Sequence, residues 1–318
     1  MSKVAAPLAA VLAALALAGC GGGGAEPGAP HGATLLLDFQ PNAVHTGIYA
    51  AQARGLYRRA GVDLKIQQPG ASTDAPKLLA AHRVEFAILD IHDLGIAREK
   101  GLDLVGVMPI VQQPLASVIV RADGPVHRPR DLDRRTAGVT GLPSDDAVLD
   151  SVVSGDGGDP SRVHRVTIGF NAITDLAARK VDAATGFWNA EAVELRRRGV
   201  PVRVFKVDRY GAPRYPELVL CTTAELAAKD PRLVAAVRAA TERGYRFTLA
   251  RPAAALSELL DHTQGLDPAT ERAELQLLLP AFRPVGALRP AVLRAWAAWD
   301  LRHGILKRRL DVGSAFSG

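Results

Sequence analysis

Apolar runs of strand length alternate with segments of helical pattern along most of the chain. The first run covers residues 34–39, and a helical stretch follows from about 45 to 60. Residues 62–66 alternate apolar and polar side chains, which is the period of a half-exposed strand. The pattern predicts further strands at 84–89, 104–110 and 116–120, with helical segments at 76–81 and 94–100 between them. Because strands alternate with helices, we expect parallel sheets in an α/β fold.

A second unit of the same kind begins near residue 121. The pattern predicts strands at 136–139, 162–168, 181–185 and 202–207, with helices at 147–154, 174–179 and 190–198 between them. From residue 224 onward the pattern is mostly helical, and Pro252, Pro268, Pro284 and Pro290 punctuate it. The chain is therefore expected to form two α/β units and a helical tail. A pocket between two such units is a natural place for a small molecule.

The first twenty residues have the features of an export signal. Lys3 precedes a small apolar run that only Pro7 interrupts, and Leu17-Ala18-Gly19-Cys20 follows. This tetrapeptide resembles the bacterial lipobox, in which the cysteine thiol receives a diacylglycerol; a plain signal peptide is the alternative. We expect a signal peptide at 1–20, a flexible tether at 21–33 and an exported protein. Lipidation of Cys20 would anchor it on the extracytoplasmic face of the cell membrane.

Composition excludes several other classes of protein. The chain is 48% hydrophobic and 23% charged, which excludes disorder for most of its length. Two cysteines exclude a disulfide framework, and the net charge of +6 comes from scattered residues, which argues against nucleic acid as a partner. The eight histidines lack the spacing of metal ligands, and the chain carries no GxSxG or phosphate-loop motif. We therefore expect no metal, no cofactor and no catalytic residues.

Several segments in the same order resemble the NMT1/THI5-like family, which includes SsuA-type proteins. They are residues 37–49, 50–57, 169–171, 180–183, 186–191 and 215–220, so the resemblance runs from 34 to about 223. It implies a type II periplasmic-binding-protein fold, with two α/β lobes that two crossovers join around a ligand cleft. Lobe 1 would comprise 34–120 plus 216–318, including the helical C-terminal segment, and lobe 2 would comprise 121–215.

The resemblance also implies a function. This branch consists of substrate-binding subunits of ABC importers, which work with permease and ATPase subunits, and its nearest members bind formylaminopyrimidine. We therefore expect capture of a formylaminopyrimidine or hydroxymethylpyrimidine for thiamin salvage. The alternative is an SsuA-like binder of an alkylsulfonate, nitrate or a riboflavin-type ring. A pyrimidine synthase is a remote alternative, because Leu89 and Asp93 stand where the family's enzymes carry a lysine and a histidine.

Recognition of a flat pyrimidine requires an aromatic face and polar groups for the ring edge. Trp188, Asn189 and Glu191 supply a stacking plane, an amide and a carboxylate just after a predicted strand. Trp188 could instead belong to the core, and Glu191 could simply begin a helix. Because the resemblance implies that this segment lies in the cleft, we expect these three residues to bind the ligand.

Other candidates also follow predicted strands or begin predicted helices. They are Asp38, Phe39, Asn42 and His45 near the first strand, Asp90 after the strand at 84–89, Ser144 and Asp145 at a helix start, and Tyr215. Each polar residue could instead be a cap, a turn residue or a surface group. Together, the acidic candidates favour an amine-bearing ligand over an anion. The resemblance places a Ser-Tyr pair where this chain has Leu89-Asp90, so an aromatic partner is replaced by a carboxylate.

Overall fold

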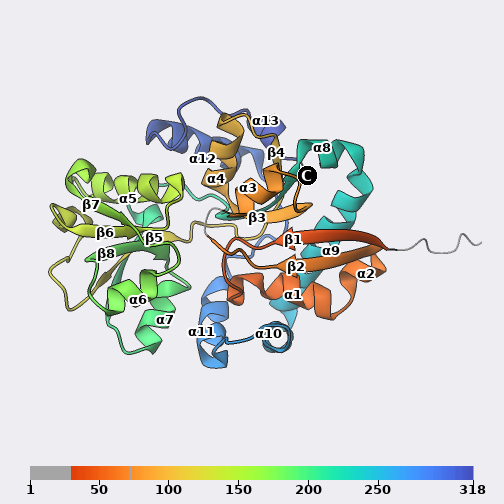
Figure 1. Ribbon diagram of the computed structural model, residues 1–318, viewed down its shortest axis with the longest axis horizontal. Coiled ribbons are helices and arrows are strands. Elements are labelled where there is room, and N and C mark those ends of the chain that lie inside the picture. The colour runs from red at the N-terminus through yellow and green to blue at the C-terminus, as the bar shows by residue number, and fades with distance from the viewer. Residues whose placement is uncertain (1–29, 72–73, 318) are drawn as a thin grey trace, which may run out of the picture.

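Two five-stranded sheets form the two lobes of the molecule (Figure 1). The computed structural model describes residues 30–71 and 74–317. The predicted signal peptide, Cys20 and most of the predicted tether lie outside this range. The first sheet contains β1 (His31–Leu36), β2 (Val62–Gln67), β3 (Phe86–Asp90), β4 (Leu104–Pro109) and β10 (Leu218–Thr223). The second contains β5 (Ala116–Arg121), β6 (Thr136–Val139), β7 (His164–Thr167), β8 (Ala183–Phe187) and β9 (Val202–Lys206).

Both sheets are mixed, whereas the sequence pattern predicts parallel sheets. The strand orders are β2-β1-β3-β10-β4 and β7-β6-β8-β5-β9, and they are equivalent. In each sheet the fourth strand runs antiparallel to both of its neighbours. These two strands, β5 and β10, are the ones that the chain enters as it crosses from one lobe to the other. Their direction therefore follows from the crossovers, which a strand-by-strand pattern does not reveal.

Two predicted boundaries require correction. The strand β5 pairs with β8 and β9, so lobe 2 begins before Ala116 rather than after residue 120. The predicted tether at 21–33 extends too far, because β1 begins at His31 and pairs residue by residue with β2. The Gly-Ala pair at 32–33 has little strand character by itself, but the neighbouring strand supplies hydrogen bonds to its backbone.

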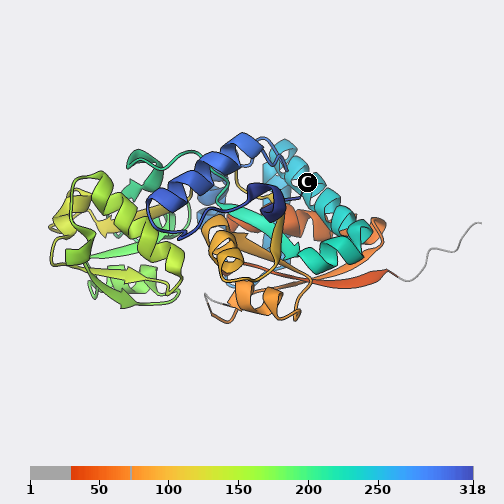
Figure 2. The same ribbon diagram turned by 90° about the horizontal axis from the view of Figure 1, so that it is seen from above.

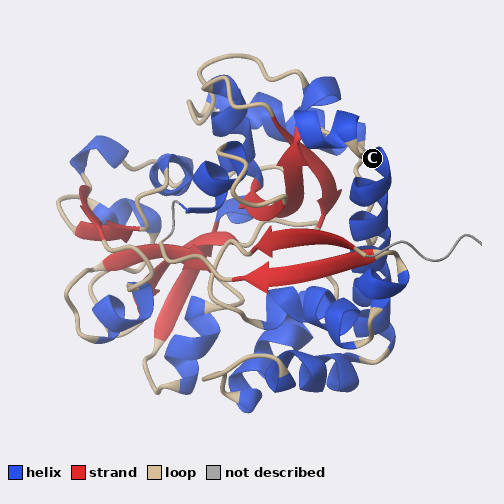
Figure 3. Ribbon diagram, turned by 45° about the vertical axis from the view of Figure 1, so that its right-hand side comes forward, coloured by secondary structure: helices blue, strands red, loops and turns tan. Residues whose placement is uncertain are grey.

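Helices cover both faces of each sheet (Figure 3). Lobe 1 carries α1 (Thr46–Ala53), α2 (Leu56–Arg59), α3 (Asp74–Ala80), α4 (Ile91–Glu99), α8 (Ala224–Lys229), α9 (Pro231–Ala250), α10 (Pro252–Asp261), α11 (Pro268–Leu278), α12 (Pro290–Arg302) and α13 (Val312–Ala315). Lobe 2 carries α5 (Pro143–Gly155), α6 (Ala172–Ala177) and α7 (Glu191–Arg197). Four of the C-terminal helices, α9 to α12, begin at a proline, whose fixed φ suits the first helical position.

The C-terminal segment packs where the two lobes meet. The helix α12 crosses this junction (Figure 2), and its Trp296 and Trp299 are almost fully buried. They belong to one apolar cluster that also includes Val118 of β5 and Val148 of α5. The strand β10 contains Cys221, which is fully buried, and this burial raises the pKa of its thiol. Apolar packing therefore holds the lobes together on this side.

Candidate ligand cleft between the lobes

A cleft of about 930 Å³, its open mouth included, lies between the two sheets. Residues at the carboxyl ends of β1 and β3 line it from lobe 1, and residues of β8, α5 and α7 line it from lobe 2. This is where α/β sheets bind ligands, because loops and helix starts converge at the ends of the strands. Seven of the predicted site residues are among those that line it: Asp38, Phe39, Asn42, Asp90, Ser144, Asp145 and Glu191.

Acidic side chains dominate the polar part of the cleft. Five carboxyl groups line it, those of Asp38, Asp90, Asp93, Asp145 and Glu191. None of the described residues along the cleft is a lysine, an arginine or a histidine. Burial raises the carboxyl pKa of Asp145 and raises those of Asp90 and Asp93 well above the usual range. A cleft of this kind offers no cationic partner to an anion, and it offers hydrogen-bond acceptors to an amine.

Glu191 is the first residue of α7, directly after the turn that follows β8. Its Oε2 atom accepts a hydrogen bond of 2.8 Å from the backbone N–H of Phe187. Burial raises the pKa of its carboxyl group to about 7, and the nearby charges of Asp145 and Glu194 act in the same direction. Gly186 leaves room for it, since a Cβ there would lie 3.3 Å from the Glu191 carboxyl group. Glu191 therefore carries a proton for much of the time at neutral pH.

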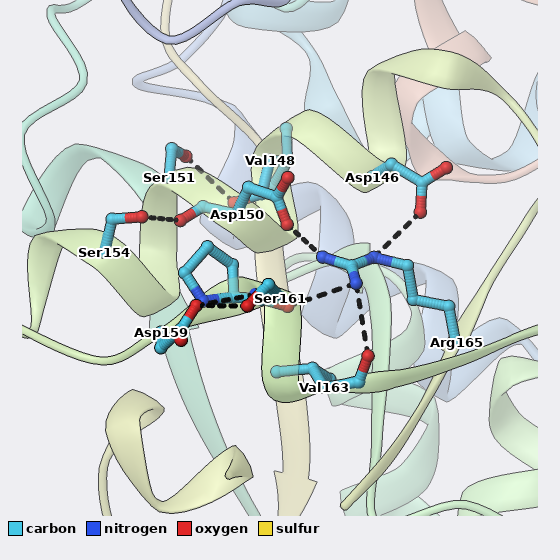
Figure 4. Close-up of polar contacts among 10 residues, drawn as sticks. Asp146, Val148, Asp150, Ser151, Ser154, Asp159, Ser161, Val163 and Arg165 are labelled. Atoms are coloured by element: carbon cyan, nitrogen blue, oxygen red, sulfur yellow. Dashed lines mark hydrogen bonds and ion pairs between the residues drawn. The ribbon is translucent and has the colours of Figure 1, made fainter. Parts of the chain in front are cut away.

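Asp145 faces the cleft, whereas its neighbour Asp146 does not. The helix α5 begins at Pro143, earlier than predicted, so both residues lie in its first turn. The Oδ2 atom of Asp145 accepts a hydrogen bond of 2.8 Å from the backbone N–H of Thr140. Asp146 instead forms an ion pair with Arg165, whose guanidinium also contacts Asp150 (Figure 4). This arginine joins α5 to β7. The Asp145 carboxyl group therefore lines the cleft, whereas the Asp146 carboxylate stabilises the packing within lobe 2.

A hydrogen-bonded chain fixes Asp38 at the end of the first strand. The Asn42 side chain accepts from the N–H of Val44, and His45 Nδ1 accepts from the N–H of Asn42 at 3.2 Å. Since Nδ1 is an acceptor, the proton of a neutral His45 ring lies on Nε2, which is 3.0 Å from Asp38 Oδ1. His45 is fully buried and does not line the cleft, although the sequence predicts a ligand contact. Its observed role is to orient Asp38.

Phenylalanines supply the aromatic faces of the cleft. Phe39 from lobe 1 and Phe170 from lobe 2 meet edge to face, with ring centroids 4.5 Å apart. Phe187, at the end of β8, is the third aromatic residue of the lining. Because Phe39 and Phe170 belong to different lobes, their contact bridges the cleft.

Trp188 does not line the cleft in this conformation, and its stacking role stays a prediction. Its indole N–H donates to the carbonyl of Pro114 at 2.9 Å. Lys206 Nζ lies 3.6 Å from the centre of the Trp188 ring, so the lysine covers one face of the indole. The end of β8 presents Phe187 to the cleft instead, one residue before the predicted position. Trp188 supports the first crossover.

Two other predicted site residues are buried away from the cleft. Asn189 is fully buried, and neither polar atom of its side chain has a hydrogen-bond partner among the described residues. Tyr215 is also fully buried, and its ring packs against His92 and Trp299. Neither residue lines the cleft in this conformation, and ligand contact by either stays a prediction.

Glu217 lies behind the floor of the cleft and joins the two crossovers. It precedes β10, and its Oε2 atom accepts hydrogen bonds from the backbone N–H groups of Leu115 and Ala116, the latter at 2.9 Å. Its carboxyl group also interacts with that of Asp90, and burial raises the pKa of both groups. Nothing in its local pattern reveals that it meets a segment a hundred residues earlier in the chain.

Comparisons with known proteins agree with this architecture. Residues 42–255 match the family described as NMT1/THI5 like. A formylaminopyrimidine-binding protein of Halalkalibacterium halodurans is 30% identical over 89% of this chain and 88% of its own. A 4-amino-5-hydroxymethyl-2-methylpyrimidine phosphate synthase of Legionella pneumophila is 26% identical over 69% of this chain and 70% of its own.

A solved structure shows the same fold. It is that of the alkanesulfonate-binding protein SsuA from Xanthomonas axonopodis pv. citri bound to MOPS. It superposes with a TM-score of 0.75 over 91% of this chain and 98% of its own, at 20% identity. Among the described residues, every helix is too short or too polar to cross a bilayer. The architecture is therefore the periplasmic-binding-protein fold, and the chain belongs to the NMT1/THI5-like family.

Proposed function

We propose that this protein is the substrate-binding subunit of an ABC importer and that it captures a thiamin-related aminopyrimidine. The ligand would be of the formylaminopyrimidine or hydroxymethylpyrimidine type, delivered to permease and ATPase subunits for thiamin salvage. Lipidation at Cys20 would hold the protein on the extracytoplasmic face of the membrane. One observation carries the proposal: the cleft presents five carboxyl groups and three phenylalanines, without a basic side chain among its described lining residues.

The chemistry of an aminopyrimidine fits such a cleft. Its amino group is a donor, and the adjacent ring nitrogen is an acceptor. A neutral carboxyl group can accept from the first and donate to the second in a cyclic pair. Glu191 is suited to this role, because its carboxyl pKa of about 7 keeps the proton available near neutral pH. Phe39, Phe170 and Phe187 provide apolar surface for the ring.

Binding fits the residues better than the synthase chemistry of the Legionella relative. The resemblance places the synthase lysine at position 89, which here is a buried leucine at the end of β3. Leucine offers no amine for a Schiff base. Asp93, at the position of the synthase histidine, is buried at the interface with Ser144 of the other lobe. We therefore propose that the chain binds its ligand without transforming it.

A thermal-shift screen tests the proposal. The purified protein is heated with formylaminopyrimidine, hydroxymethylpyrimidine, thiamin, riboflavin, taurine or nitrate. A ligand at about 100 times its Kd stabilises the folded state by about 2.7 kcal/mol. We expect a shift with the aminopyrimidines and none with taurine or nitrate. A shift produced by an anion alone would contradict the assigned ligand class, whereas a shift with riboflavin alone would replace the pyrimidine by a larger ring.

A further inference from the structure

A cluster of three ligating side chains lies at and below the floor of the cleft. Asp90, His92 and Glu217 each offer one nitrogen or oxygen atom, and these three atoms lie within 4.8 Å of one another. His92 and Glu217 are fully buried, and Asp90 lines the cleft. Among residues 30–71 and 74–317, this is the one group of three such residues close enough to hold a metal ion.

Two of these side chains carry atoms that lack a hydrogen-bond partner. Nε2 of His92 and Oε1 of Glu217 are completely buried, and neither has a partner among the described residues. Leaving such buried atoms unsatisfied is energetically unfavourable, and more so for charged groups. The other atom of each group is already engaged: Glu217 Oε2 accepts from the crossover backbone, and His92 Nδ1 lies 2.8 Å from Asp300 Oδ2. The free atoms are therefore those available to a bound ion.

The surroundings of His92 resemble the outer shell of a metal site. Metal-binding histidines usually donate their second N–H to a carboxylate, which fixes the ring and its tautomer. Asp300 of α12, itself fully buried, occupies this place. The ring also packs edge to face on Tyr215, with centroids 4.8 Å apart, and the indole N–H of Trp296 donates to Nδ1 at 3.0 Å, so Nδ1 is engaged by two neighbours. These contacts leave Nε2 as the nitrogen that can coordinate.

We propose that Asp90, His92 and Glu217 form a binding site for a divalent transition-metal ion such as Zn²⁺. One imidazole and two carboxylates suit zinc or manganese, whereas magnesium and calcium prefer oxygen ligands alone. In a tetrahedral zinc site the ligand atoms lie about 3.4 Å apart, so binding would draw the three groups together by about an ångström. Asp90 opens onto the cleft, which provides a path for the ion and a place for a fourth ligand.

Zinc alone is the probe, so the test does not depend on the identity of the pyrimidine. Full-length protein is stripped with a chelator, desalted and titrated with Zn²⁺ by calorimetry, with Mg²⁺ and Ca²⁺ for comparison. We expect one tight equivalent of Zn²⁺ and no uptake of the other two ions. X-ray absorption of the loaded protein is expected to show only nitrogen and oxygen ligands at about 2.0–2.1 Å, with one imidazole among them.

Variants locate the bound ion. The exchange D90N keeps the cap that Asp90 places on the His92 N–H at the start of α4, because asparagine caps helices as well as aspartate does. We expect D90N and E217Q to weaken Zn²⁺ binding at least tenfold, and D300N to weaken it about 10–100-fold. The control is H82Q, which removes an exposed histidine that lies 3.8 Å from Glu225. This variant should bind Zn²⁺ like the wild type.

Two results would overturn the assignment. Either the wild type takes up no zinc after stripping, or D90N and E217Q bind it as tightly as the wild type does. In the first case the Asp90 and Glu217 carboxyl groups share a proton instead of a metal ion. In the second case the ion binds elsewhere. If E217Q does not fold, as thermal unfolding would reveal, D90N decides, because its cap is preserved.

Discussion

A single carboxyl group, that of Glu191, links the electrostatics of the cleft to the proposed ligand. Its pKa is raised to about 7 mainly by burial. The folded state therefore holds this proton more tightly than the unfolded chain does. The stability from Glu191 is fully present below the unfolded pKa of 4.5 and is lost as the pH rises through 7. The affinity for a ligand that pairs with the neutral carboxyl group would likewise fall as the pH rises through 7.

We predict that E191Q and E191A behave differently. Glutamine has the donor and acceptor of a neutral carboxyl group, so E191Q should keep aminopyrimidine affinity within a few-fold at pH 6. Above pH 7, wild-type affinity should fall by up to about tenfold per pH unit, while that of E191Q stays flat. E191A should lose more than tenfold at every pH. Calorimetry between pH 6 and 8.5 measures this; equal pH profiles for wild type and E191Q would contradict the role of Glu191.

Neighbouring aromatic residues at the end of β8 provide a second prediction. Phe187 lines the cleft, so F187A should weaken ligand binding at least tenfold. Trp188 donates to Pro114, so W188F should cost about 1 kcal/mol of stability and change affinity less than threefold. Titration and chemical denaturation of both variants test this contrast. The opposite ranking of affinities would restore Trp188 as the stacking residue.

Residue types in the cleft were more predictable than residue positions. Asp38, Asp90, Asp145 and Glu191 all follow strands or begin helices, and the pattern places such residues at the sheet edge. The choice between Phe187 and Trp188 was not predictable in this way. A shift of one residue at the end of a strand reverses the direction in which the side chain points. A sequence pattern locates a strand end only to within a residue or two, so it leaves this choice open.

At the scale of elements, α1 and α9 pack so closely that two glycines are required. A Cβ on Gly244 would lie 2.0 Å from the carbonyl oxygen of Gly47. A Cβ on Gly47 would lie 2.4 Å from the ring of Tyr245, whose hydroxyl donates to the carbonyl of Val44 at 2.7 Å. These contacts fix the helix that follows Asn42 and His45. The cleft geometry around Asp38 therefore depends on this packing.

We predict that G244A destabilises the protein by about 1–3 kcal/mol through overpacking, despite the better helix propensity of alanine. The matched control is G32A on β1, where a Cβ would meet nothing within 4 Å. The free energy of unfolding of that variant should lie within about 0.5 kcal/mol of the wild-type value. Urea denaturation followed by circular dichroism compares them. A G244A variant as stable as G32A would show that the helices separate at little cost.

The order of the elements was predictable, but the direction of two of them was not. The strands at 62–66 and 136–139 and the helices of the C-terminal segment follow from period and from prolines at helix starts. The antiparallel direction of β5 and β10 depends on which lobe the chain enters next. That is a long-range property, and the resemblance to a known family, rather than periodicity, predicted the two crossovers.

At the scale of the whole molecule, contacts between the lobes define a closed conformation. Phe39 meets Phe170 at the cleft, and Asp93 meets Ser144 there as well. A ligand that touches both lobes stabilises this state relative to an open one, because only the closed state offers both sets of contacts. In the proposed import function, closure would be the signal that a permease reads.

We predict that F170A favours the open state. Removing the ring deletes the edge-to-face contact, an interaction of about 0.5–1.5 kcal/mol, so ligand affinity should fall about 2–10-fold. Small-angle X-ray scattering should show a larger radius of gyration for unliganded F170A than for the wild type, and saturating ligand should restore the compact value. Identical scattering of the two unliganded proteins would show that this ring pair does not control closure.

The interrupted first sheet has a consequence for the order in which the chain gains structure. All strands of the second sheet lie in one uninterrupted stretch, β5 to β9, whereas β10 must insert between β3 and β4 after that whole stretch has been made. Closing so long a loop is slow, because its entropy is lost before the pairing is gained. Pulsed hydrogen exchange during refolding should therefore protect β6 and β8 before β3 and β4. Until the last third of the chain follows, β4 and one edge of β3 therefore lack a strand partner, while β1, β2 and β3 can already pair with one another.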